Sequence, residues 1–119
     1  MNYEEPIHRI IGGIVHSPAF ADKLPQQREF YNLTPPEYWE LLHAHASAFR
    51  MWKVTYMHTL PSHEAVMDWY RGTGMRPYLQ ALDDAGRKKF EAEVFAQVRE
   101  EYPTPVSYTH LRAHETKAN

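Results

Sequence analysis

The 119-residue sequence contains no cysteine, which excludes disulfide bonds, thiolate metal ligands and a cysteine nucleophile. It also lacks an apolar run near the ~20 residues that span a bilayer, and it does not open with the basic and then apolar stretch of a signal peptide. A surplus of positive charge is absent too, because the formal net charge is −2. Basic surfaces for nucleic acid or an anionic membrane are therefore not expected, and we expect a cytoplasmic protein.

A metal site is not predicted, although the chain has eight histidines. No His-Glu-x-x-His motif occurs. His43 and His45 are two apart within a predicted helix, so they point to different sides of it, and His58 and His63 are five apart across a turn.

Local signals divide the chain into several helices and one convincing strand. Isoleucines three and four residues apart predict a helix over residues 5–16, with Pro6 in its first turn. Thr34 and Glu37 form the pattern of a capping box before a second helix. Aromatic and β-branched residues predict a strand over residues 49–58. Further helices are expected at residues 62–71, 77–80 and from Asp83 or Asp84 to about 101.

A helix, a short link and then a strand is the order of elements in α/β proteins. We therefore predict an α/β fold that is rich in helix, with four or five helices and a truncated sheet of one to three strands. Bare sheet edges would invite non-specific self-association.

The richest stretch for ligand binding runs from Trp52 to Leu82, where a strand-to-helix corner is crowded with aromatic and basic side chains. Arg76 is the best candidate for substrate contact, because a planar guanidinium binds a carboxylate through two parallel hydrogen bonds. The alternative is a surface arginine that pairs with Asp68 or Asp83.

Two histidines of the same corner, His58 and His63, could donate hydrogen bonds to a polyanion or merely satisfy nearby backbone groups. Aromatic side chains could wall a pocket, although at these spacings they are more often simply core. These candidates are Tyr31, Tyr56, Trp69, Tyr70 and Tyr78.

Several short motifs carry a resemblance to a known family. They are Glu5-Pro6 with His8, Trp52…Thr55-Tyr56…His58, Pro61-Ser62-His63, Asp68-Trp69, Thr73-Gly74, Arg76-Pro77, Leu79-Gln80 and Glu101-Tyr102-Pro103. Their order and spacing resemble the C-terminal part of bacterial trans-aconitate 2-methyltransferases, over about nine tenths of the chain. Met57 and Met75 depart from the family pattern by apolar or near-isosteric exchange.

The resemblance implies a Rossmann-like class I methyltransferase that transfers a methyl group from S-adenosylmethionine to a carboxylate of trans-aconitate, giving a monomethyl ester. A carboxylate is already a nucleophile, so no general base and no catalytic residue is assigned. The substrate-binding residues expected from the corner are Arg76, His58, His63, Tyr56, Trp69 and Tyr78.

The sequence contains no glycine-rich cofactor loop between a strand and a helix, since Gly12 and Gly13 lie inside a helical stripe. We therefore expect residues 1–104 to be the C-terminal, substrate-side part of a methyltransferase domain, inactive alone. Two alternatives stay open: a methyltransferase acting on another small carboxylic acid, and a free-standing helical binding module that uses its aromatic patch.

We expect the tail to have a separate origin. The run Val-Ser-Tyr-Thr-His-Leu-Arg-Ala-His-Glu-Thr over residues 106–116 resembles the translation of a transposase adapter used to prepare sequencing libraries. In the family, a last strand of the sheet would follow soon after Tyr102-Pro103. We assign no function to His110 or His114, and we expect residues 105–119 to be an artefactual, disordered tail.

Overall fold

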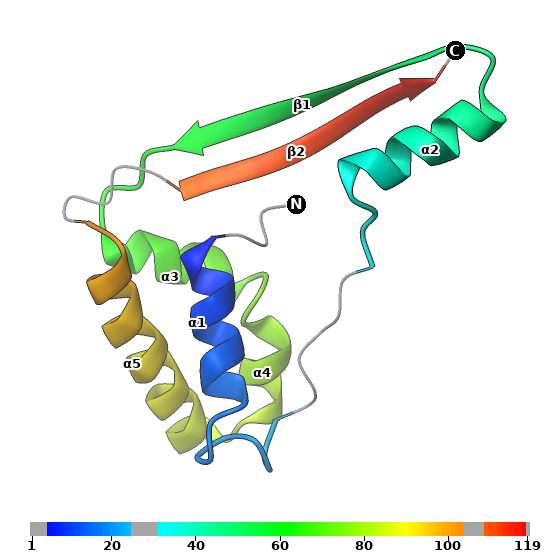
Figure 1. Ribbon diagram of the computed structural model, residues 1–119. Coiled ribbons are helices and arrows are strands. Elements are labelled where there is room, and N and C mark those ends of the chain that lie inside the picture. The colour runs from blue at the N-terminus through cyan, green and yellow to red at the C-terminus, as the bar shows by residue number, and fades with distance from the viewer. Residues whose placement is uncertain (1–4, 25–30, 104–108, 119) are drawn as a thin grey trace.

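The computed structural model describes residues 5–24, 31–103 and 109–118 (Figure 1). Within them lie five helices and two strands. In chain order these are α1 (Pro6–Val15), α2 (Pro35–His45), β1 (Phe49–His58), α3 (His63–Arg71), α4 (Arg76–Ala81), α5 (Asp84–Glu101) and β2 (Thr109–Ala118). The helix-rich character expected from the sequence is confirmed.

Helix starts follow the predicted caps. Thr34 and Glu37 exchange bonds as a capping box, with the Glu37 amide 3.4 Å from Thr34 Oγ1 and the Thr34 amide 2.6 Å from Glu37 Oε2. Ser62 Oγ accepts from the Ala65 amide at 3.2 Å and so caps α3. Each side chain satisfies a backbone donor that the first turn of a helix leaves free.

The cap of α5 needs a glycine beside it. Asp83 Oδ1 accepts from the Gly86 amide at 2.7 Å, and a Cβ atom built on Gly86 would lie 2.8 Å from that same oxygen. Any larger residue would therefore push the capping carboxylate away. Of the two aspartates predicted as caps, Asp83 is the one that fills the role.

Helices α1, α3, α4 and α5 form the helical body, which encloses the hydrophobic core (Figure 1). Helix α1 packs against α5, and α3 contacts both α4 and α5. The buried residues of α5, which are Phe90, Val94 and Val98, repeat every four residues and so share one face of the helix. The buried core residues are Ile7, Ile10, Ile11, Ile14, Val15, Phe20, Val66, Met67, Tyr70, Met75, Tyr78, Leu82, Phe90, Val94, Val98 and Tyr102.

Helix α2 and strand β1 project from the helical body and are called here the α2–β1 arm (Figure 1). Helix α2 buries none of its residues, and its contact with β1 includes an edge-on packing of the Trp39 and Phe49 rings at 4.7 Å. The Cα radius of gyration is 17.4 Å, against about 13–14 Å for a compact domain of this length. The projecting arm accounts for this extended shape.

The sheet within the described residues has two strands. Strand β2 pairs antiparallel with β1 in a register that runs from Phe49 opposite Ala118 to His58 opposite Thr109. The prediction of a disordered tail over residues 105–119 thus differs from the structure at Thr109–Ala118. The physical reason is that an exposed strand offers a row of unpaired backbone donors and acceptors, which any extended segment can satisfy. Residues 105–108 and 119 of the predicted tail lie outside the described residues.

The different burial of the body and the arm gives a stability test. We expect Phe90→Ala, at a fully buried position, to lower the free energy of unfolding by about 3–5 kcal/mol, because it leaves a cavity in the core. Leu41→Ala on the exposed face of α2 should cost below about 1 kcal/mol. Urea unfolding followed by circular dichroism measures both, and equal losses would contradict the assignment of the core to the helical body.

Candidate functional site

The predicted ligand corner lies where β1 ends and α3 begins. His58, the last residue of β1, places its ring edge-on to the indole of Trp69 on α3, with 5.1 Å between ring centroids. Both side chains are half-buried. The structure therefore brings two of the six predicted site residues into direct contact.

His63 is engaged with the backbone. Its Nε2 atom lies 3.0 Å from the carbonyl oxygen of Tyr102, a residue 39 positions further along the chain. This bond ties the first turn of α3 to the end of α5. The sequence offered a backbone role as the alternative for this histidine, and the structure shows such a contact with a distant carbonyl group.

Arg76 starts α4 and is exposed. Within the described residues its side chain has no ion pair or hydrogen bond. Both carboxylates considered as its partners are in use elsewhere, because Asp68 pairs with Arg71 and Asp83 caps α5. The guanidinium is thus available to an outside carboxylate.

The two tyrosines of the predicted set lie in different environments. Tyr78 is only 3% exposed and packs against Phe90 with 6.1 Å between ring centroids, so its ring belongs to the core. Tyr56 on β1 is 47% exposed. Only Tyr56 could line an open surface in this structure, since the core covers the ring of Tyr78.

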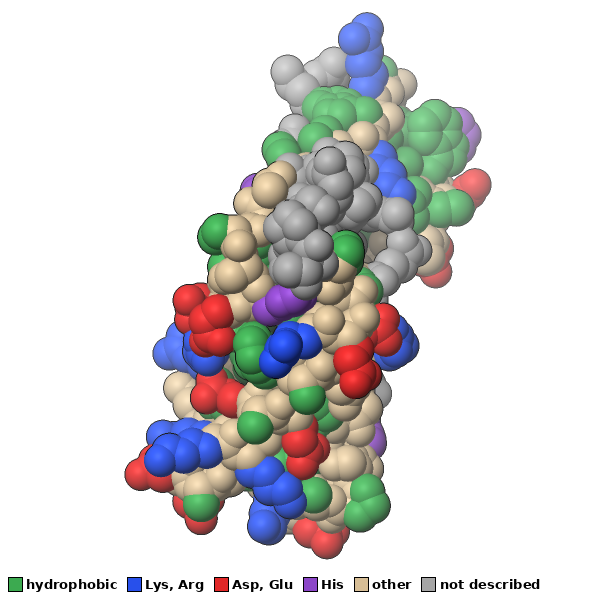
Figure 2. Space-filling view, turned by 90° about the vertical axis from the view of Figure 1, so that its left-hand side faces the viewer, with side chains coloured by type: hydrophobic (Ala, Val, Ile, Leu, Met, Phe, Trp, Pro, Cys, Tyr) green, Lys and Arg blue, Asp and Glu red, His purple; other side chains and the backbone are tan. Residues whose placement is uncertain are grey.

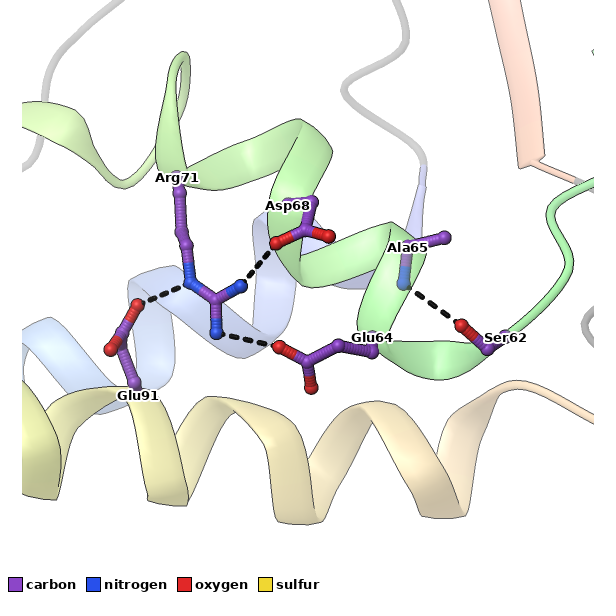
Figure 3. A network of polar contacts seen from close by, with 6 residues as sticks. All are labelled: Ser62, Glu64, Ala65, Asp68, Arg71 and Glu91. Carbon is purple, nitrogen blue, oxygen red and sulfur yellow. Dashed lines mark hydrogen bonds and ion pairs between the residues drawn. The ribbon is translucent and has the colours of Figure 1, made fainter.

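A charge cluster that the sequence analysis did not identify joins α3 to α5 (Figure 3). The Arg71 guanidinium lies between three carboxylates: its Nε is 2.6 Å from Glu91, its Nη2 is 2.8 Å from Glu64, and its Nη1 contacts Asp68. The hydrogen bond to Glu91 is the main reason that the pKa of Arg71 is raised. Glu64, Asp68 and Arg71 are spaced four and three apart, which was the local signal available.

Buried polar groups gather where α1 begins and α5 ends. The Tyr102 hydroxyl is buried. Burial first, and then the charge of Glu5, raises the pKa of Tyr102. The half-buried ring of His8 stands edge-on to Tyr70 at 5.5 Å, and burial lowers the pKa of His8.

Two kinds of feature are absent from the described residues. No group of three or more histidine, aspartate or glutamate side chains there could hold a metal ion. In the same part of the chain, no helix combines the length and the apolar character that crossing a membrane requires.

Comparison with known proteins gives a consistent result. The chain is 36% identical over 104 residues to a trans-aconitate 2-methyltransferase of Streptomyces avermitilis, a match that covers 86% of this chain and 39% of that enzyme. It is 34% identical to the enzyme of the same name from Klebsiella pneumoniae and 38% identical to that of Streptomyces coelicolor, again over 86% of the chain. No protein-family model matches.

The chain is homologous to part of the trans-aconitate 2-methyltransferases. This confirms the resemblance found in the motifs. The chain spans about two fifths of the length of these relatives. The larger share of each trans-aconitate 2-methyltransferase thus lies outside the matched region.

The carboxylates of the charge cluster should contribute unequally to the stability of the fold. Glu91 has a side chain that is 28% exposed and reaches Arg71 from the opposite helix, whereas Asp68 is 69% exposed and lies on the same helix as Arg71. We expect Glu91→Gln to lower the free energy of unfolding by about 1 kcal/mol, and Asp68→Asn to have almost no effect. Chemical denaturation of the two variants measures the difference, and equal losses would contradict the larger contribution assigned to Glu91.

The half-buried position of His8 makes the stability of the fold depend on pH. Its pKa in the folded state is below the ordinary value of about 6.5, so the unfolded chain binds more protons in that range, and stability falls as the pH drops below about 6.5. His8→Gln should make the loss of stability between pH 7 and pH 5 smaller. Urea unfolding at several pH values tests this, with His43→Gln on the exposed α2 as the control, and an unchanged slope in the His8 variant would refute it.

Proposed function

We propose that this chain is the substrate-side part of an S-adenosylmethionine-dependent carboxyl O-methyltransferase, and that the substrate is trans-aconitate. The names of its relatives support the reaction and the substrate class. The observation on the chain itself that carries the proposal is the exposed Arg76 side chain, which has no carboxylate partner within the described residues. A Rossmann-like fold and a cytoplasmic location belong to the same proposal.

Trans-aconitate carries three carboxylates, and methylation removes the negative charge of only one of them. A site for it must therefore also neutralise the charge of carboxylates that do not react. The planar guanidinium of Arg76 can hold a non-reacting carboxylate through two parallel hydrogen bonds. Fixing the substrate in this way leaves the reacting carboxylate free to act as the nucleophile, and it needs no base because it is already deprotonated at neutral pH. The role proposed for Arg76 is therefore orientation and charge neutralisation.

The paired rings of His58 and Trp69 supply a second element. They lie at the junction of β1 and α3, where a half-buried aromatic wall would exclude water from one side of a bound acid. We assign them, with the exposed Tyr56, to the lining of the substrate site. His63 acts there through its bond to Tyr102, which holds the start of α3 in place.

The described residues do not fit the cofactor. S-adenosylmethionine in Rossmann-like folds is held at a glycine-rich turn between a strand and a helix, but Gly12 and Gly13 lie inside α1, and Gly72 and Gly74 follow helix α3. We therefore propose that the cofactor is held by the part of the domain that the relatives carry outside the matched region. Turnover would require that part.

Two other candidates are less well supported. A methyltransferase for another small carboxylic acid would use Arg76 equally well, so the substrate test must include other acids. A free-standing binding module is disfavoured by the similarity to several enzymes of one name over 86% of the chain.

The role of Arg76 can be tested in a chimera in which the matched region of the Streptomyces avermitilis enzyme is replaced by the corresponding residues of this chain. We expect the chimera to transfer labelled methyl groups to trans-aconitate. Arg76→Lys keeps the charge but loses the two-pronged geometry, so the KM for trans-aconitate should rise about tenfold or more, with the KM for the cofactor unchanged.

Arg99→Lys is the matched control, because Arg99 is an exposed arginine on α5 whose guanidinium lies 5.9 Å from the Phe95 ring. It should leave both KM values unchanged. A folded chimera that methylates other small acids but not trans-aconitate would overturn the substrate, and an unchanged KM in Arg76→Lys would overturn the contact.

A further inference from the structure

Helix α4, which begins at Arg76, is too short to be stable by itself. It has six residues, and isolated helices below about 12 residues are marginal in water. Arg76 also stands directly before Pro77, a place where the backbone is biased away from helical angles. Within the described residues, no side chain caps the start of the helix. The position of Arg76 is therefore set by contacts between α4 and the rest of the helical body.

The far end of α4 is held by burial and by α5. Tyr78 and Leu82 are 3% and 5% exposed, and Nε of Arg87 on α5 donates to the carbonyl oxygen of Leu79 at 2.6 Å. A carbonyl group in the last turn of a helix has no partner inside that helix, so this bond secures an end that would otherwise fray. The other end of α4, where Arg76 lies, needs a separate attachment.

Thr73 attaches the start of α4 to the end of α3. Its hydroxyl donates to the carbonyl oxygen of Trp69 at 3.0 Å, and its own carbonyl accepts from the amide of Arg76 at 3.3 Å. The Trp69 carbonyl is one of the four at a helix C-terminus that lack a partner within the helix. The Thr73 amide donates to the Tyr70 carbonyl instead, at 3.2 Å, so the hydroxyl takes over the Trp69 carbonyl. One residue thus bonds to the backbone of both Trp69 and Arg76.

The remainder of the turn leaves this link little freedom. A Cβ atom built on Gly74 would lie 3.1 Å from Cδ1 of Tyr70, so the turn rests directly on that ring. Met75 is fully buried, and its amide donates to the Tyr70 carbonyl at 2.9 Å. A turn packed in this way transmits a shift of Thr73 to Arg76 and does not absorb it, because close-packed interiors yield little.

The Arg76 side chain differs from several other arginines of the helical body in the absence of a carboxylate partner. Figure 2 shows acidic and basic side chains mixed over this surface, and Arg9, Arg71 and Arg87 each form an ion pair. Arg76 forms none within the described residues. Since no such partner fixes its guanidinium, the direction of that group depends on the backbone from which it extends.

We propose that Thr73 is a positioning residue, which sets the place of Arg76 relative to Trp69. The proposal rests on the proposed function, in which Arg76 holds a non-reacting carboxylate and Trp69 lines the substrate site. An acid that is held at two points binds well only when those points keep their separation. The Thr73 hydroxyl maintains this separation through the backbone.

Two changes at position 73 of the chimera test this role. Thr73→Val removes the hydroxyl and keeps the shape, so the KM for trans-aconitate should rise about fivefold, as expected for the loss of one neutral hydrogen bond. The KM for the cofactor should not change. Thr73→Ser keeps a hydroxyl and should bring the KM for trans-aconitate back close to that of the parent chimera. Thr34→Val is the matched control, because it removes a hydroxyl that bonds to the Glu37 amide at the start of α2, and it should leave both KM values unchanged.

A double variant separates a role through Arg76 from a general loosening of the fold. If Thr73 acts by placing the guanidinium, Thr73→Val should have almost no further effect on the KM in a chimera that already carries Arg76→Ala. A merely structural role predicts that the two effects multiply. Effects that multiply, or an unchanged KM in Thr73→Val alone, would overturn the positioning.

Amide exchange in the 119-residue chain gives a readout that does not depend on catalysis. Thr73→Val should speed the exchange of the Met75 and Arg76 amides about tenfold relative to the amide of Val94 on α5, because it loosens the turn locally. Exchange that keeps the same ratio in the variant and the parent chain would overturn the link between α3 and α4.

Failure of the proposed function gives a different pattern. If Arg76→Lys raises the KM for trans-aconitate and Thr73→Val does not, the function stands and only the positioning falls. If neither change alters the KM, the carboxylate contact and the positioning fall together. A chimera that methylates a different small acid removes trans-aconitate as the substrate, and the same variants measured with that acid then decide the positioning.

Discussion

The packing of α1 against α5 is the contact on which the other elements depend. The isoleucine stripe of α1 and the stripe of Phe90, Val94 and Val98 on α5 are almost fully buried, and they join segments about 80 residues apart in the sequence. Burying one such side chain contributes roughly 1.5–3 kcal/mol. Helices α3 and α4 are short, and short helices in water owe their stability mainly to tertiary contacts. They therefore form where α1 and α5 provide a surface to cover.

The candidate corner follows from this packing. The end of α5 places the carbonyl group of Tyr102 beside His63, and the bond between them anchors the first turn of α3. The Arg71 cluster fixes the other end of α3 to α5 through Glu91 (Figure 3). Held at both ends, α3 presents Trp69 to His58 at the end of β1. A side chain that positions α3 thus also positions the proposed aromatic wall of the site.

Features set by neighbours in sequence could be predicted, and those set by distant partners could not. Caps such as Thr34 and Ser62 depend on residues three positions away, so the helix starts were predicted correctly. The partner of His63 is 39 residues distant, and nothing in the local pattern identifies it. Tyr78 has the same local signal as an exposed aromatic residue, yet the helical body buries it. That the Arg76 guanidinium is available to an outside carboxylate depends on Asp68 and Asp83 having other partners, and the sequence does not show those partners.

The contrast between the helical body and the α2–β1 arm also shows what secondary structure alone leaves undetermined. Helix α2 has a capping box and yet covers no core, because a cap stabilises a helix wherever its apolar side chains lie. Strand β1 was predicted at its observed bounds, but strand propensity does not say which partner pairs with an edge. In the structure that partner is β2. Pairing through the backbone requires little of the side chains, so the sequence of β1 alone does not specify which segment lies beside it.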